Sequence, residues 1–328
     1  MSREDDISAF LAQAGFEATR AMPLAEDASF RRYLRLVGGP RPAVLMDAPP
    51  PEEVRSFLGV GDHLAGLGLS VPEVIAADTG RGLLLLEDLG DALYPEVAQE
   101  VGLEPLFDAA VDALLAIQAA PAPQFLPRWD AQAMAKTALG TLLDWWWPAT
   151  FGQAAPAAAR HDFAQALATM LSVLDGPNVF VHRDYFAGNL LWLKARHGIR
   201  RVGVLDFQSA AIGHPAYDLA ALTQDARREV PAALGERATA RFLAARPELD
   251  PARFRAGLVV CAAQRHMRVA GQWVRLALRD GKPRYLAYGP RTWQLLAAAL
   301  RHPATAPLKA AFDHWIPMEH RGNPQMAA

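Results

Sequence analysis

The sequence predicts an α+β protein of two lobes, a small antiparallel β lobe with one helix and a larger helical lobe that contains one hairpin. Three observations predict this fold. Short apolar strands separated by turns fill residues 1–88, long alanine- and leucine-rich helical segments dominate residues 89–328, and an island of strand at 179–206 interrupts the helices. We therefore divide the chain into a 1–88 lobe and an 89–328 lobe.

Composition excludes several classes of protein. The formal net charge of the 328 residues is -2, so no basic surplus indicates a nucleic-acid partner. The single cysteine, Cys261, can form neither an intrachain disulfide nor a cysteine-based zinc site, and its apolar surroundings predict a buried side chain. The acidic N-terminus is unlike a signal peptide, and no apolar run reaches the ~20 residues of a membrane span. We expect a cytoplasmic protein with neither a membrane nor an obligate protein partner.

The elements of the first lobe follow from periodicity and turn signals. An amphipathic helix is expected over 6–15, and the alternation of apolar residues with arginine predicts a strand over 30–37. The turn Gly38-Gly39-Pro40 predicts a hairpin with a strand over 43–46. After the break at Pro49-Pro50-Pro51 we expect a helix to about residue 65 and then two strands, 74–77 and 83–86.

The second lobe is predicted from its helical segments. These are expected at 103–120, 131–145, 156–174, 216–228, 234–245, 251–279 and 289–301. The island at 179–206 has two apolar pieces around Arg196-His197-Gly198, which indicates a hairpin.

One motif in this island carries chemistry. His182-Arg183-Asp184 is followed by Asn189 with the spacing H-R-D-x-x-x-x-N, and Asp206-Phe207 comes 22 residues after Asp184. Phosphoryl transfer needs a carboxylate to accept a hydrogen bond from the attacking hydroxyl, and oxygen ligands to hold Mg²⁺ on the phosphates of ATP. Asp184 fits the first role, and Asn189 and Asp206 fit the second. We expect all three at strand ends in one hairpin.

Other residues near the motif have predicted supporting roles. His182 is expected to be a structural hydrogen-bonding residue. Asp218 is expected to cap the helix that begins near it, to hydrogen-bond to the catalytic loop, or to do both. Arg183 approaches substrate or makes a structural ion pair. The apolar strand 83–86 suits an adenine slot, with backbone groups around Glu87 and Leu89 supplying hydrogen bonds.

Features of protein kinases are missing. Only about eight residues separate Phe207 from the next helix, so the long segment with which protein kinases bind peptides is absent, and there is neither a G-x-G-x-x-G loop nor a V-A-I-K lysine. Nucleotide contacts are expected from the turn that holds Ser29 and Phe30, through backbone N–H groups and the Ser29 hydroxyl. Met46 stands where the lysine is expected.

A different cation must then face the phosphates, or Mg²⁺ must suffice. Arg31 and Arg32 are the candidates, and strand alternation lets at most one of them point inward. We assign Arg32 to the nucleotide site, with Glu52 or Glu53 as the possible acidic partner of whichever arginine points inward.

These motifs resemble those of the aminoglycoside phosphotransferase and choline kinase superfamily, which implies a protein-kinase-like fold. The chain is similar in particular to the bacterial anomeric kinases of N-acetylmuramic acid and N-acetylglucosamine in cell-wall recycling. Four segments carry this likeness, at 27–33, 44–50, 181–185 and from 264–266 through 280–286. The resemblance implies an ATP- and Mg²⁺-dependent kinase, with Asp184 as base and Asn189 and Asp206 as metal ligands. The loop at Phe186-Ala187-Gly188 departs from the family's bulkier or more basic pattern.

The helical lobe offers a site for an amino-sugar substrate, built from Arg183, Tyr185, Gln208, Arg265 and His266. An arginine on the 251–279 helix could pair with the lactyl carboxylate of N-acetylmuramate, or the basic residues could form a solvated face. The tryptophans at 145–147 could stack on a sugar ring, although at least one is expected in the core. The alternative is a kinase of an aminoglycoside or choline, for which an acidic pocket is expected. A non-catalytic nucleotide-binding module would have lost Asp184 or Asp206.

Overall fold

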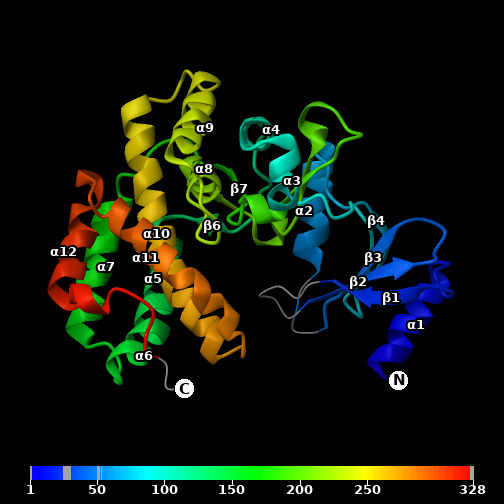
Figure 1. Cartoon of the computed structure of the whole chain (residues 1–328), viewed down its shortest axis with the longest axis horizontal. Coiled ribbons are helices and arrows are strands. Elements are labelled where there is room, and N and C mark those ends of the chain that lie inside the picture. Colours follow the sequence, from blue (N-terminus) through cyan, green and yellow to red (C-terminus); the bar gives the residue numbers. More distant parts are fainter. Residues whose placement is uncertain (1, 25–30, 50–51, 53, 326–328) are drawn as a thin grey trace. The chain divides into compact units, whose positions relative to one another are not determined.

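The computed structural model describes residues 2–24, 31–49, 52 and 54–325 (Figure 1). Its contacts divide the chain into two compact units, Met1–Ala113 with Gly188–Ser209, and Leu114–Ala187 with Ala210–Ala328. The first unit contains a five-stranded sheet and the second is mainly helical. The predicted α+β class is confirmed, whereas the division after residue 88 stays a prediction.

The five-stranded sheet of the first unit is antiparallel throughout and has the order β1-β2-β3-β5-β4. Its strands are β1 Arg20–Pro23, β2 Arg32–Val37, β3 Ala43–Asp47, β4 Val74–Asp78 and β5 Leu83–Glu87. The predicted hairpin is present as β2–β3, with Leu34 opposite Leu45. β1 was not predicted, because its four residues are all exposed and therefore show no alternation.

One face of this sheet packs against helix α1, Arg3–Gln13. Phe10 and Leu11 of the helix join a buried cluster with Leu45 and Leu85 of the two central strands. The helix begins with a capping box, in which Ser2 and Asp5 satisfy each other's backbone N–H groups. Because side chains alternate along a strand, Met46 lies on the sheet face opposite to Leu45. Met46 is fully buried.

The remaining elements of the first unit are helices and a second, smaller hairpin. They are α2 Arg55–Gly66, α3 Tyr94–Val101, most of α4 Leu103–Ala119, and the paired strands β8 Leu190–Trp192 and β9 Val202–Val204. Phe57 of α2 packs on Phe207, which follows β9, with ring centroids 4.7 Å apart. Ser70 Oγ donates to the Arg200 carbonyl at 2.6 Å. These contacts fix the β8–β9 hairpin inside the first unit.

The second unit is organised around one long helix, α10 Pro251–Leu278. Its other elements are β6 Arg128–Trp129, α5 Ala131–Thr141, the π-helix Leu142–Trp146, α6 Trp147–Phe151, α7 Ala157–Leu171, β7 Val179–Val181, β10 Ala211–Gly213, α8 Ala216–Thr223, α9 Ala232–Ala244, α11 Gly289–Ala299 and α12 Ala306–Trp315. Helix α10 packs against α5, α8 and α11, and Cys261 is buried within it. In the described part of the chain no helix has both the length and the hydrophobicity of a membrane span.

The close packing of α10 depends on a glycine. A Cβ atom on Gly271 would lie 2.3 Å from the carbonyl carbon and oxygen of Thr141, at the junction of α5 with the π-helix. No side chain can occupy that space without moving the two helices apart. Gly271 therefore sets the distance at which α10 crosses α5.

The hairpin expected around Arg196-His197-Gly198 is present as β8–β9, but strand β7 is not part of it. Strand β7 pairs with β10 in a three-stranded sheet of the second unit, whereas β8 pairs with β9 in the first unit. Asp184 follows β7, but Asn189 and Asp206 flank the β8–β9 hairpin. The sequence could not reveal this because three-residue strands are too short to show which partner they choose.

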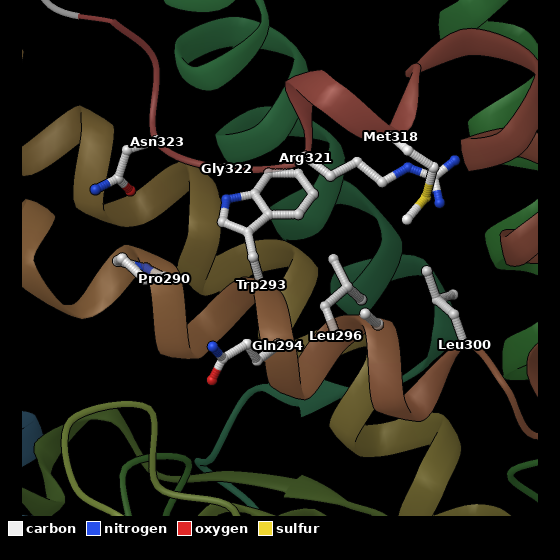
Figure 2. A pocket seen from close by; sticks show the side chains of 10 residues that line it. Pro290, Trp293, Gln294, Leu296, Leu300, Met318, Arg321, Gly322 and Asn323 are labelled. Carbon is white, nitrogen blue, oxygen red and sulfur yellow. The ribbon is translucent and has the colours of Figure 1, made fainter.

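Two of the three tryptophans at 145–147 lie in the core, where at least one was expected, and Trp145 is half-buried. Trp146 and Trp147 are buried, and Trp146 donates to the Gly322 carbonyl at 2.7 Å and packs on Trp293. Figure 2 shows Trp293 pointing from α11 toward the chain segment at Gly322, where a cavity of about 380 Å³ lies. The charged side chain of this cavity, Arg321, is paired with Asp313 at 2.9 Å.

Candidate active site

The catalytic loop is held by Asp218 of helix α8. The Asp218 carboxylate accepts the backbone N–H of His182 at 2.6 Å and that of Arg183 at 2.8 Å. Arg183 has φ of +73°, a strained conformation for a residue with a side chain. Of the two roles predicted for Asp218, the hydrogen bond to the loop is the one the structure displays. Burial raises the pKa of Asp218 to about 7, against the opposing effect of the two N–H donors.

His182 and Tyr185 support the loop from inside. Both side chains are fully buried, and their rings meet edge to face at 5.6 Å. The His182 Nδ1 atom accepts the backbone N–H of Asp184 at 3.3 Å. The predicted structural role of His182 agrees with these contacts. Tyr185, predicted to bind substrate, has no exposed surface with which to do so.

Asp184 is surrounded by guanidinium groups. Burial raises the pKa of its carboxyl, but the positive charges around it prevail and lower the pKa to about 2. These charges belong to Arg265, Arg268, Arg183 and Arg227. Asp184 is therefore ionised at neutral pH and ready to accept a hydrogen bond from a hydroxyl group.

Arg265 is bound to the loop itself. Its Nη1 donates to the Arg183 carbonyl at 2.7 Å, and its Nη2 lies 3.5 Å from Asp184 Oδ1. Arg183 in turn stacks its guanidinium on the ring of Trp129, 3.8 Å from the centroid. Both arginines thus position the catalytic loop, although the sequence assigned them to the substrate.

The other two guanidiniums are held differently. Arg268 lies about one helical turn after Arg265 on the same face of α10, with its Nη2 3.9 Å from Asp184 Oδ1. Arg227 lies over the rings of Phe186 and Trp273, at 4.4 Å and 5.2 Å from their centroids. Sequence reasoning missed Arg227, because it follows the end of α8 in a turn that carries no motif.

His266 and Gln264 point into the core of the second unit. His266 is fully buried beside Gln224, with Nε2 3.2 Å from the Gln224 Oε1, and Gln264 donates to the Met134 carbonyl at 2.7 Å. Burial, helped by the charge of Arg265, lowers the pKa of His266 to about 3. His266, predicted to contact substrate, is thus enclosed within the second unit, and its Nε2 atom faces Gln224.

Oxygen ligands meet at the ends of the β8–β9 hairpin in the first unit. Asn189 Nδ2 lies 3.5 Å from Asp206 Oδ2, and Leu205 N–H donates to the Asn189 carbonyl at 3.0 Å. Asp206 has φ of +58°, the other non-glycine residue with a positive φ in the described chain. Gln208, predicted to contact sugar, donates its amide to Asp206 Oδ1 at 2.6 Å. It thus orients a predicted metal ligand.

The arginines of the β lobe separate as strand alternation requires. Arg31 has 9% of its side chain exposed and lies 3.1 Å from Glu52, whereas 61% of the Arg32 side chain is exposed and its guanidinium pairs with the buried Asp47. Arg32 is thus held on the outside of the sheet, and Arg31 is the arginine that points inward. Glu52 precedes α2 rather than lying on it.

The other predicted nucleotide contacts are placed as follows. Ser29 and Phe30 lie outside the described residues. Glu87 ends β5 and pairs with Arg196 at 2.6 Å, while Leu89 is half-buried in the segment after it. The Glu87 side chain is therefore engaged within the first unit, and its backbone N–H donates to the Glu73 carbonyl at 2.8 Å.

Comparison with known proteins agrees with this arrangement. The model of the phosphotransferase enzyme family matches residues 20–255. An N-acetylmuramate/N-acetylglucosamine kinase of Caulobacter vibrioides is 40% identical over 97% of this chain and 98% of the relative. An N-acetylmuramate/N-acetylglucosamine kinase of Pseudomonas aeruginosa is 37% identical over 88% of this chain and 86% of the relative.

Solved structures show the same fold. A choline/ethanolamine kinase family protein from Mesorhizobium loti has a TM-score of 0.65 at 19% identity, covering 94% of this chain and 99% of that one. A GDP complex of aminoglycoside 2'-phosphotransferase-IIIa has a TM-score of 0.61 at 16% identity, covering 91% and 99%. The predicted kinase-like fold and the resemblance drawn from the motifs are both confirmed: the chain belongs to the phosphotransferase enzyme family.

Proposed function

We propose that this chain is an ATP- and Mg²⁺-dependent sugar kinase that phosphorylates the anomeric hydroxyl of N-acetylmuramic acid, N-acetylglucosamine or both. The observation that carries the proposal is an ionised Asp184 on a loop fixed by Asp218, in a chain 40% identical to a kinase named for these two sugars. Such a kinase would act in the cytoplasm on a small molecule.

Asp184 is the residue that orients the acceptor. Its carboxylate accepts a hydrogen bond from the anomeric hydroxyl and aligns the oxygen for attack on the terminal phosphate. Arg265 keeps the loop carbonyl of Arg183 and the Asp184 carboxylate in place. Positioning of this kind supplies most of the catalysis in phosphoryl transfer, since the protein makes no covalent bond to the phosphate.

Asn189 and Asp206 have the chemistry of a Mg²⁺ site. Both offer side-chain oxygens, the ligands that Mg²⁺ prefers, and their side chains lie within 3.5 Å of each other. Within the described residues no group of three or more His, Cys, Asp or Glu side chains could hold a metal ion alone. Phosphate oxygens and water would complete the shell, and the ion would neutralise charge on the transferred group.

Nucleotide binding is assigned to the β lobe. Arg31, held by Glu52, is the cation that takes the place of the missing lysine, and backbone groups between Glu87 and Leu89 bind the base. Ser29 and Phe30 remain candidates for the phosphate contacts.

The test is a panel of acceptors incubated with ATP and Mg²⁺: N-acetylmuramate, N-acetylglucosamine, kanamycin and choline. ADP release gives the rate, and phosphorus NMR identifies an anomeric phosphate. Asp184→Asn should lower the rate by a factor on the order of 10² or more. Asp175→Asn removes an exposed carboxylate paired with Arg253 and serves as the matched control.

Each outcome has a definite meaning. An anomeric phosphate that is lost in Asp184→Asn and kept in Asp175→Asn supports the proposal. Turnover of kanamycin or choline instead of the sugars would replace it with the alternative, an aminoglycoside- or choline-type phosphotransferase. The cationic surroundings of Asp184 argue against that alternative, because amine substrates carry positive charge themselves.

A further inference from the structure

The four guanidiniums around Asp184 fall into two pairs. Arg183 and Arg265 are used by the protein, one stacked on Trp129 and the other hydrogen-bonded to the loop carbonyl. Arg268 and Arg227 have no hydrogen-bond acceptor for their guanidinium groups among the residues that the structure describes. The second pair therefore has donors to offer to a ligand.

Arg268 shows this most directly. Its side chain is 15% exposed, its Nε atom is buried without a hydrogen-bond partner in the described chain, and Nη2 reaches only to 3.9 Å from Asp184. A buried donor without an acceptor is costly to a fold, so a native structure that keeps one usually fills it with water or ligand. Arg268 is thus a cation close to the Asp184 carboxylate whose N–H groups can still donate hydrogen bonds to a ligand.

Arg227 is fixed in orientation without using its N–H groups. The rings of Phe186 and Trp273 hold the guanidinium by its faces, and the donors of a guanidinium lie in its plane. The turn that carries it is fixed too, since the Arg227 backbone N–H donates to Asp225 Oδ1 at 2.8 Å. A rigid guanidinium of this kind suits a planar anion, which it can bind with two parallel hydrogen bonds.

The local charge favours an anionic ligand. Four guanidiniums lie close enough to Asp184 to affect its titration, and two further acids lie near them. Asp218 is buried with both its oxygens bound to N–H groups, and Asp225 accepts the backbone N–H of Arg227, so the guanidiniums still outnumber the acids. The cluster is therefore in positive excess in the space where an acceptor hydroxyl must approach Asp184.

We infer that Arg268 and Arg227 form a subsite that binds the lactyl carboxylate of the acceptor sugar while its anomeric hydroxyl contacts Asp184. The inference rests on the proposed function and makes it more specific. N-acetylmuramate differs from N-acetylglucosamine by one lactyl ether, and the carboxylate of that ether is the only charge that distinguishes the two sugars. This subsite would then make N-acetylmuramate the preferred acceptor.

A double comparison of variants and substrates tests the subsite. We would measure kcat/KM for N-acetylmuramate, its neutral lactyl methyl ester and N-acetylglucosamine, in the wild type and in Arg268→Gln and Arg227→Gln. Loss of a hydrogen bond to a charged group should lower kcat/KM for N-acetylmuramate by roughly 10- to 100-fold relative to N-acetylglucosamine. In the wild type, kcat/KM for the neutral methyl ester should be lower than that for N-acetylmuramate by a similar factor. In the variants, kcat/KM for the ester should fall little further.

Controls separate this role from a structural one. Arg253→Gln removes an exposed arginine from the same helix and should leave the substrate ratio unchanged, while Arg268→Lys keeps the charge and should restore part of the preference. Thermal unfolding of each variant shows that it is folded.

The outcomes distinguish the two levels of the proposal. If the wild type phosphorylates both sugars and the variants slow both by the same factor, the arginines serve the transferred phosphate or the loop, and the subsite is refuted while the kinase stands. If the wild type phosphorylates neither sugar, the proposed function fails and the subsite fails with it.

Discussion

Asp218 of helix α8 accepts the backbone N–H of His182, the residue after β7, at 2.6 Å, and both residues are fully buried. Asp218→Ala would leave this N–H and that of Arg183 without an acceptor, at a cost of about 1–3 kcal/mol for each orphaned donor. We expect a lower urea midpoint and a fall in kcat, because the strained Arg183 backbone loses its support. Asp218→Asn, which keeps one acceptor oxygen, should have a urea midpoint and a kcat between those of the wild type and Asp218→Ala. Unchanged kcat in a destabilised Asp218→Ala protein would show that the loop does not depend on this residue.

The buried His266 makes stability depend on pH. Its pKa in the folded protein is lowered to about 3, whereas an unfolded histidine takes up a proton near 6.5. Between these values the unfolded state binds more protons than the folded state. The contribution of His266 to the free energy of unfolding is therefore fully present above about pH 6.5 and decreases as the pH falls below that value.

The measurement is the urea midpoint at pH 7 and pH 5 in the wild type and in His266→Gln. We expect a smaller decrease in the variant. His214, whose pKa burial lowers to about 4, acts in the same window and leaves a residual decrease in both proteins. Equal decreases in both would show that His266 is accessible to protons in the folded state.

Gly271 should not tolerate a side chain. The added methyl group of Gly271→Ala would meet the Thr141 carbonyl at 2.3 Å, and overpacking of this kind costs about 1–3 kcal/mol. Gly66, the last residue of α2, has no atom within 4 Å of an added Cβ. Gly66→Ala should therefore be neutral or stabilising by up to about 1 kcal/mol. Thermal unfolding of the two variants checks the contrast, and similar melting temperatures would contradict it.

The two neighbouring arginines of the β lobe should behave differently. Arg31→Gln and Glu52→Gln remove the two halves of the inward ion pair, and we expect each to raise the KM for ATP. The double variant should add little to either single one, because both remove the same interaction. Arg32→Gln should leave the KM for ATP unchanged and lower stability by less than about 1 kcal/mol, since Arg32 is exposed and Arg3 also pairs with Asp47. An Arg32→Gln protein with weakened ATP binding would restore the assignment made from the sequence.

Much of the fold could be predicted from the sequence wherever a segment carries its own period. The β2–β3 hairpin follows from alternation around a turn, and helix α10, predicted over 251–279, spans Pro251–Leu278. Helix α3 was missed, although Pro95 stands in its first turn. The partner of β7 was not predicted, because three residues cannot encode a choice between sheets, whereas the β8–β9 hairpin lies around Arg196-His197-Gly198 as expected.

The sequence predicts the candidate site less completely than the fold. Asp184, Asn189 and Asp206 could be proposed as site residues because their spacing is a property of the chain itself. The different contacts of the arginines could not be predicted, because they depend on which guanidinium group lies beside a carbonyl or an aromatic ring in three dimensions. Arg265 was assigned to substrate and holds the loop, while Arg227 went unnoticed in a turn after α8.

The ring of arginines also bears on the timing of the proton in the reaction. A carboxylate whose pKa is lowered by neighbouring guanidinium groups is a weak proton acceptor, so in the proposed reaction Asp184 would not remove the proton from the sugar hydroxyl before the oxygen begins to bond to phosphorus. The hydroxyl becomes acidic enough only as that bond forms. In the proposed reaction the carboxylate would therefore first orient the hydroxyl group by accepting its hydrogen bond, and it would receive the proton late, after the phosphorus–oxygen bond is largely made.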